Sequence, residues 1–236
     1  GVPVIQMIFA GSNEDDWRDN LNGLGARDIA MNVALPEVDG RIISRAVSFK
    51  AEARFDELTQ SPVIAYRGVQ DRIDFVCDLA ANWLTLAATK PSRRRLALIF
   101  ANYPNKDGRL GNGVGLDSPA SALNVLRALN DAGYETGTLP EKGDDLIHRL
   151  AAGPTNDLTD RAQRAGGIRY AVADYEQFFE TLPAELRDQV SQRWGSAGDD
   201  PFVVGDDFVL SAFHQGKVVI GLQPARGYHI DPKASY

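Results

Sequence analysis

The chain has 236 residues, of which 44% are hydrophobic and 24% charged, with a net charge of −7 and a pI near 5.0. These values fit a globular protein with one large or two small α/β domains. Because the net charge is negative, nucleic acid or an anionic membrane is disfavoured as a binding partner. No apolar run approaches the ~20 residues of a membrane span. Cys77 is the single cysteine, which excludes an internal disulfide and a multi-cysteine zinc site. With no recognisable signal peptide, we expect a cytoplasmic protein.

The first third of the chain alternates short strands with helices. Strands are predicted at 2–10, 29–35, 41–49 and 63–66, and helices at 13–21 and 70–88. The strand at 29–35 is expected to end at Pro36. In the helix at 70–88, apolar residues recur at i, i+3, i+4 and i+7. Cys77 falls on this stripe, so we expect it to be a small core residue. The basic segment that follows, 90–95, is the best candidate for a linker.

The stretch 96–133 carries the clearest functional pattern. Its opening run Leu-Ala-Leu-Ile-Phe predicts a strand buried on both faces. A loop at 102–117 with four glycines follows, and Ser118 and Pro119 then predict the N-cap and first position of a helix. Strand, loop and helix form the first half of a βαβ unit. Ligands of such units bind beyond the carboxyl end of the strand, which is where this loop lies.

The remainder of the chain predicts further helices and a hairpin. Elements are expected at 134–139 (strand), 144–152, 158–164, 174–179 and 183–194 (helices), and 207–213 with 217–222 (hairpin strands). The fold class is therefore α/β, with Rossmann-like, mainly parallel sheets flanked by helices. We expect residues 1–91 to be the C-terminal part of a first α/β domain that ends in a long helix. Residues 92–236 are expected to form a second α/β domain, incomplete at its C-terminal end, within a larger multidomain protein.

The glycine-rich loop does not match a phosphate-binding loop. A P-loop needs Lys-Ser or Lys-Thr after its last glycine, whereas Gly115 is followed by Leu116 and Asp117. An aspartate at this helix start would repel the phosphates of a nucleotide, so nucleotide binding is disfavoured. Glycines also permit close approach of a large flat ligand to the backbone. The alternative is that the loop merely packs against a neighbouring domain.

Three segments, in order, resemble one protein family. They are FANYPN with GNGVGLDSPASALNVLRALNDAGY at 100–134, AMNVALPEVDGR at 30–41, and GLQPARGY at 221–228. Together they resemble the CobN/magnesium chelatase H-subunit family, and within it the large subunit of aerobic cobaltochelatase more than the magnesium enzyme. Since that large subunit is several times longer, the resemblance also implies that this chain is an internal fragment.

The resemblance implies an activity and its partners. The implied activity is the ATP-dependent insertion of Co²⁺, as substrate, into hydrogenobyrinic acid a,c-diamide during cobalamin biosynthesis. ATP and Mg²⁺ would be used by two further subunits, one of them an AAA+ ATPase, and not bound by this chain. The fragment alone is expected to be inactive. Alternatives are Mg²⁺ insertion into protoporphyrin IX by a magnesium chelatase H-subunit, or a non-catalytic small-molecule-binding α/β module.

Candidate site residues follow from this implied chemistry. Hydrogen bonds and close contacts to a tetrapyrrole are assigned to six substrate-binding residues: Asn102, Tyr103, Asn112, Gly115, Arg226 and Tyr228. Arg226 would pair with a ring carboxylate. Asp117 either caps its own helix or accepts protons from the ring nitrogens. His229 is a second catalytic candidate, and with Asp231 it offers donor atoms for Co²⁺. The alternative for this tail is an exposed loop end without a ligand.

Overall fold

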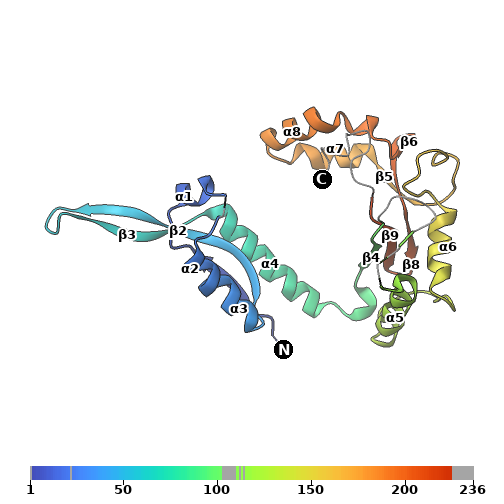
Figure 1. Ribbon diagram of the computed structural model, residues 1–236, viewed down its shortest axis with the longest axis horizontal. Helices are drawn as coiled ribbons and strands as arrows, with labels where there is room; N and C mark the ends of the chain where they lie inside the picture. Colours follow the sequence, from blue (N-terminus) through green and yellow to red (C-terminus); the bar gives the residue numbers. More distant parts are fainter. Residues whose placement is uncertain (1, 22, 103–109, 112, 114, 225–236) are drawn as a thin grey trace. The chain divides into compact units, whose positions relative to one another are not determined.

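The computed structural model describes residues 2–21, 23–102, 110–111, 113 and 115–224. The chain divides into two compact units, Gly1–Thr89 and Lys90–Tyr236, whose elements are traced in Figure 1. Helices and strands are mixed throughout, which confirms the predicted α/β class. Among the described residues, no helix is both long enough and apolar enough to cross a membrane.

The first unit is built on a three-stranded sheet in the order β1-β2-β3, in which β1 and β2 are parallel and β2 and β3 antiparallel. Its elements are β1 (Ile5–Phe9), α1 (Glu14–Asp19), α2 (Ala26–Ile29), η1 (Ala30–Ala34), α3 (Leu35–Val38), β2 (Ile42–Asp56), β3 (Ser61–Gly68) and α4 (Gln70–Ala88). A small core forms around Ile8, Ala46 and Phe49. Trp17 of α1 closes it, with its ring 5.0 Å from that of Phe49 and under the guanidinium of Arg72.

Two predictions for the first unit are wrong. The apolar run at 29–35 is helical, not a strand, and continues through η1 into α3. The turn before Pro36 is a wide π-turn in which Leu35 N–H bonds to Ala30 O. Pro36 stands in the first turn of α3, where the N–H that proline lacks is not needed. Cys77 is exposed, and Val76 is the buried residue of α4. The apolar stripe of α4 is therefore covered near Ile73 and Val76 but exposed from Leu84 to Ala88 in the described structure.

The hairpin β2–β3 reaches far beyond this core, as Figure 1 shows. The first half of the 15-residue strand β2 contains four consecutive buried residues, whereas most of its second half and of β3 is exposed. Phe55, Leu58 and Ile64 are among the exposed apolar side chains of the hairpin. One continuous strand therefore joins the core of the unit to a projecting arm.

The second unit contains two three-stranded sheets, in the orders β4-β9-β8 and β5-β7-β6. Its elements are η2 (Pro91–Arg93), β4 (Leu96–Phe100), α5 (Ser118–Asp131), α6 (Asp144–Ala152), β5 (Ile168–Ala171), α7 (Val172–Glu180), α8 (Ala184–Trp194), η4 (Ala197–Asp199), β6 (Val203–Val204), β7 (Asp207–Leu210), β8 (Ala212–Gln215) and β9 (Val218–Leu222). Strands β4 and β9 are parallel, and β8 and β9 form an antiparallel hairpin. A hairpin was predicted here, but its first strand, 207–213, is divided: β7 pairs with β5 and β6 in the other sheet, and the hairpin strand β8 begins at Ala212.

Helices α5 and α6 cover one face of the sheet β4-β9-β8. Their inward side chains pack on alternate residues of β4 and β9, which gives the core Phe100, Leu110, Ala122, Leu123, Leu126, Leu146, Leu150, Val218, Ile220 and Leu222. The other face of β4 is open, because the Ile99 side chain is 54% exposed. Strand β4 is therefore buried on one face within the described residues, not on both as its apolar run predicted.

Several further predictions for the second unit need correction. Residues 134–139 form no strand and 158–164 no helix, whereas β5 and β6 were not predicted. Two of the six strand pairings in the described ranges are parallel, namely β1–β2 and β4–β9. The others are antiparallel. The sheets are thus mixed and not mainly parallel, because hairpins add antiparallel strands beside each parallel pair.

Candidate functional site

The parallel strands β4 and β9 end side by side at one edge of their sheet. Gln223, the residue after β9, donates its backbone N–H to the carbonyl of Phe100 at 2.8 Å. Asn102 lies two residues beyond Phe100 and is only 4% exposed. Neither amide atom of its side chain has a hydrogen-bond partner among the described residues. A buried amide without partners is costly and rare, so Asn102 is marked as a candidate for binding a polar ligand.

A second asparagine reaches the same edge from a different part of the chain. Asn156 is 6% exposed and donates its Nδ2–H to the carbonyl of Gln223 at 2.9 Å. Its Oδ1 has no hydrogen-bond partner in the part of the chain that the structure describes. Sequence reasoning did not select Asn156. The available signal was the run Gly153-Pro154-Thr155-Asn156-Asp157, which is typical of a structured turn.

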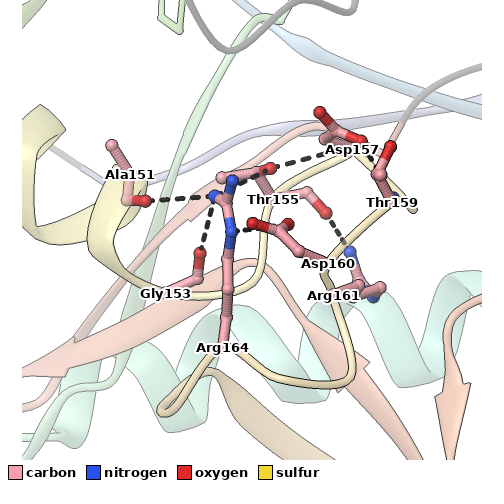
Figure 2. Close-up of polar contacts among 8 residues, drawn as sticks. All are labelled: Ala151, Gly153, Thr155, Asp157, Thr159, Asp160, Arg161 and Arg164. Carbon is pink, nitrogen blue, oxygen red and sulfur yellow. Dashed lines mark hydrogen bonds and ion pairs between the residues drawn. The ribbon is translucent and has the colours of Figure 1, made fainter.

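Two arginines fix the loop that carries Asn156, as Figure 2 shows. Arg161 is 3% exposed and donates from Nη1 to the carbonyl of Thr155 and from Nη2 to that of Val209 in β7. Arg164 donates to the carbonyls of Ala151 and Gly153, at 3.2 and 3.3 Å. These side-chain bonds use the backbone carbonyls of an irregular segment. Residues 158–164, predicted as a helix, instead form turns, with the backbone N–H groups of Gln163 and Arg164 bonded to the carbonyl of Asp160.

Asp157 completes this loop with a bond to its own backbone. Its Oδ1 accepts the backbone N–H of Thr159 at 2.9 Å. This hydrogen bond, joined by that of the Thr159 side chain and by the nearby charge of Arg164, lowers the pKa of Asp157. The carboxylate therefore stays ionised at neutral pH beside Asn156.

The glycines of the predicted ligand loop have different roles where they are described. Gly111 has a positive φ of 66°, and a Cβ there would lie 2.9 Å from Ile147 Cδ1 and 3.2 Å from Phe100 Cδ1. This glycine lets the loop pack tightly on the core. Gly115 also has a positive φ, of 76°, but an added Cβ would meet nothing within 4 Å. The backbone at Gly115 is therefore open to a neighbour or ligand.

Asp117 is the N-cap of α5. Its Oδ1 accepts the backbone N–H of Ala120 at 3.0 Å, so the cap is Asp117 and not Ser118 as predicted. The carboxylate is exposed and lies at the positive end of a 14-residue helix. Capping is compatible with a second role as proton acceptor, since the cap uses one of the two carboxylate oxygens and the residue is open to solvent.

The other predicted site residues lie outside the described ranges. These are Tyr103, Asn112, Arg226, Tyr228, His229 and Asp231. Within the part of the chain that is described, no group of three or more His, Cys, Asp or Glu side chains is arranged to hold a metal ion. The assignment of His229 and Asp231 as donors to Co²⁺ stays a prediction.

A separate hollow of about 870 Å³ lies in the second unit against α7 and α8. Its lining mixes aromatic side chains with polar ones such as Glu176 and Asp200, and Tyr175 is stacked on Phe179 at 5.7 Å and in edge contact with Phe208 at 5.3 Å. None of the predicted site residues that the structure describes lines this hollow. The polar groups beyond the ends of β4 and β9 are therefore the better candidate site.

These observations define an α/β protein in which buried amide atoms of Asn102 and Asn156, unpaired among the described residues, lie beyond the carboxyl ends of a parallel strand pair. The chain belongs to the CobN/magnesium chelatase family, whose model matches residues 1–236. It is 49% identical over 237 residues to the aerobic cobaltochelatase subunit CobN of Sinorhizobium sp, covering 100% of this chain and 18% of that protein. The aerobic cobaltochelatase subunit CobN of Pseudomonas aeruginosa is 46% identical, over 100% of this chain and 19% of that protein.

More distant relatives and a solved structure agree with this placement. The magnesium-chelatase H-subunit of Rhodobacter capsulatus is 27% identical, over 92% of this chain and 18% of that protein. The solved catalytic subunit of cobaltochelatase from Mycobacterium tuberculosis matches with a TM-score of 0.79 and 36% identity, over 99% of this chain and 19% of that one. The chain thus spans less than a fifth of the length of these relatives, as expected for an internal fragment.

Proposed function

We propose that this chain is part of the tetrapyrrole-binding subunit of an ATP-dependent cobaltochelatase. In this proposal the parent protein inserts Co²⁺ into hydrogenobyrinic acid a,c-diamide for cobalamin synthesis, in the cytoplasm. Two partner subunits, one an AAA+ ATPase, hydrolyse ATP with Mg²⁺. The fragment by itself does not catalyse insertion.

One observation carries the choice of cobalt over magnesium. Identity to CobN subunits is 46–49% over the whole chain, against 27% to the magnesium-chelatase H-subunit of Rhodobacter capsulatus. The loop before α5 also lacks the Lys-Ser/Thr pair of a nucleotide site. This lack supports a division of labour in which ATP is bound by other subunits.

The described residues suit the binding half of this chemistry. Asn102 and the open backbone at Gly115 offer hydrogen bonds and close approach to a ring periphery. Metal insertion must also remove protons from ring nitrogens, and the exposed carboxylate of Asp117 is a base at the end of the same loop. Tyr103, Asn112, Arg226 and Tyr228 remain proposed substrate contacts, and His229 and Asp231 proposed metal contacts.

The test is a binding titration with the full-length parent protein. Metal-free hydrogenobyrinic acid a,c-diamide and protoporphyrin IX are each titrated while tryptophan quenching is followed, for the wild type and for Asp117→Ala and His229→Ala. We expect tight binding of the corrin and weak binding of the porphyrin. Preference for the porphyrin would instead assign the chain to a magnesium chelatase. Binding of neither ring would contradict the chelatase proposal and favour a non-catalytic binding module.

A further inference from the structure

The edge beyond β4 and β9 presents a defined set of unused hydrogen-bonding groups. Within the described ranges, the side-chain NH₂ and carbonyl of Asn102 and the side-chain carbonyl of Asn156 have no hydrogen-bond partner. The orientation of the Asn156 amide is settled by its bond to the carbonyl of Gln223, because only the NH₂ end can donate there. The free atom of Asn156 is therefore an acceptor. The set comprises one donor group and two acceptors.

Both asparagines are attached to the same pair of strand ends. Asn102 follows Phe100 by two residues, Phe100 accepts the N–H of Gln223, and Gln223 accepts the N–H of Asn156. The buried Arg161 in turn connects the loop of Asn156 to β7, because it donates to the carbonyls of both Thr155 and Val209. Asn156 is thus positioned by its hydrogen bond to a strand end, and Asn102 by its burial directly after β4. A site with rigidly held polar groups selects its ligand by their pattern.

A primary carboxamide complements this pattern. Its two N–H groups can bond to the carbonyls of Asn102 and Asn156, and its carbonyl can accept from the NH₂ of Asn102. A carboxylate has acceptors only, so it would face two carbonyl oxygens with one donor group available. An alkyl group would leave every buried amide unsatisfied.

We infer that Asn102 and Asn156 form a subsite that recognises a primary carboxamide on the periphery of the substrate. The inference rests on the proposed function and deepens it, since the subsite selects an amidated ring over one that carries free carboxylates at the same positions. Asn156 acts here as a specificity-determining residue, at a distance along the chain from the glycine-rich loop.

The experiment compares two ligands on the full-length parent protein. Hydrogenobyrinic acid a,c-diamide and the non-amidated hydrogenobyrinic acid are titrated against the wild type, Asn102→Ala and Asn156→Ala. Asn130→Ala is the matched control, because it removes an amide of the same unit whose Oδ1 already accepts the Thr136 hydroxyl at 3.2 Å. Thermal melting of each variant is measured alongside. Asn102→Ala breaks no described side-chain hydrogen bond, so it tests the subsite even if Asn156→Ala disturbs the loop.

We expect the wild type to bind the diamide at least about tenfold more tightly than the acid. Each asparagine variant should lose about tenfold in affinity for the diamide, as expected for one hydrogen bond, while affinity for the acid changes within about twofold. Equal losses for both ligands, or an equal effect of Asn130→Ala, would show a structural role and overturn the inference. A wild type that binds a ring without this preference overturns the inference alone, whereas one that binds neither ring overturns the proposed function.

Discussion

Gly143 lies directly against the first turn of α5, so close that a Cβ on it would come within 2.3 Å of the carbonyl carbon of Pro119. Its own φ of −62° is open to any residue, so the constraint is steric. We predict that Gly143→Ala forces α5 and α6 apart and lowers the free energy of unfolding by about 1–3 kcal/mol. Thermal or denaturant unfolding of the parent protein measures this loss.

The matched control for that substitution is Gly198→Ala. Gly198 lies in η4, and a Cβ there would meet nothing within 4 Å. Its unfolding free energy should change by less than about 0.5 kcal/mol. Equal stability of the two variants would mean that the beginnings of α5 and α6 are not packed as described.

Asp117 can be tested for its two roles with a pair of substitutions. Asp117→Ala removes the cap of α5 and should lower stability by about 1 kcal/mol. Asp117→Asn keeps a side-chain acceptor for Ala120 N–H and should retain that stability, but it cannot take up a proton from a ring nitrogen. If Asp117 is the proton acceptor, the Asn variant loses cobalt insertion in the reconstituted complex while its melting curve is unchanged. Full insertion by this variant would leave capping as its role.

Arg161 is predicted to be essential for the loop that carries Asn156. It is buried, donates to two backbone carbonyls and lies with its guanidinium 4.1 Å from the ring centroid of Phe202. Arg161→Lys cannot reproduce this planar pair of donors, and we expect a loss of at least about 2 kcal/mol in unfolding free energy. The control is Arg169→Lys, because Arg169 forms an exposed ion pair with Asp207, whose loss should be worth less than about 1 kcal/mol.

Asp157 gives the loop a defined dependence on pH. Its pKa is lowered in the folded state, so its hydrogen bond to Thr159 stabilises the loop above the unfolded pKa, ordinarily ~3.9. That stabilisation is lost as the pH falls through the lower, folded pKa. Hydrogen exchange of a peptide covering 153–164, corrected for intrinsic rates, should show protection lost only below pH ~3.9. Asp157→Asn should remove this acid step, and loss of protection at higher pH in the wild type would contradict the assignment.

Elements defined by local pattern could be predicted from the sequence, whereas those defined by distant partners could not. The periodicity of α4 and α6 gave their bounds, Gln70–Ala88 and Asp144–Ala152, as the structure has them. The segment around Pro36 was predicted as a strand because apolar, β-branched residues precede a proline. In the structure this segment is helical and includes a π-turn, which has no simple sequence pattern.

The candidate site shows the same division. Asn102 could be selected because it directly follows a recognisable strand, and Asp117 because it precedes a helix. Asn156 could not, since its place depends on the bonds of Arg161 to Val209, 48 residues along the chain. The strand predicted at 134–139 failed for a similar reason. Its carbonyls at Thr136 and Thr138 are taken by the Gln215 side chain rather than by a neighbouring strand.

The packing of Trp17 on Phe49 has a spectroscopic consequence. Of the chain's three tryptophans, Trp17 joins the core of the first unit, while Trp194 of the second unit is 52% exposed. Emission from Trp17 should therefore shift to longer wavelength when the first unit melts, whereas emission from Trp194 is already that of a hydrated indole. In residues 1–236 with Trp83 and Trp194 replaced by Phe, Trp17 is the one tryptophan left, so a red shift of its emission reports the melting of the first unit.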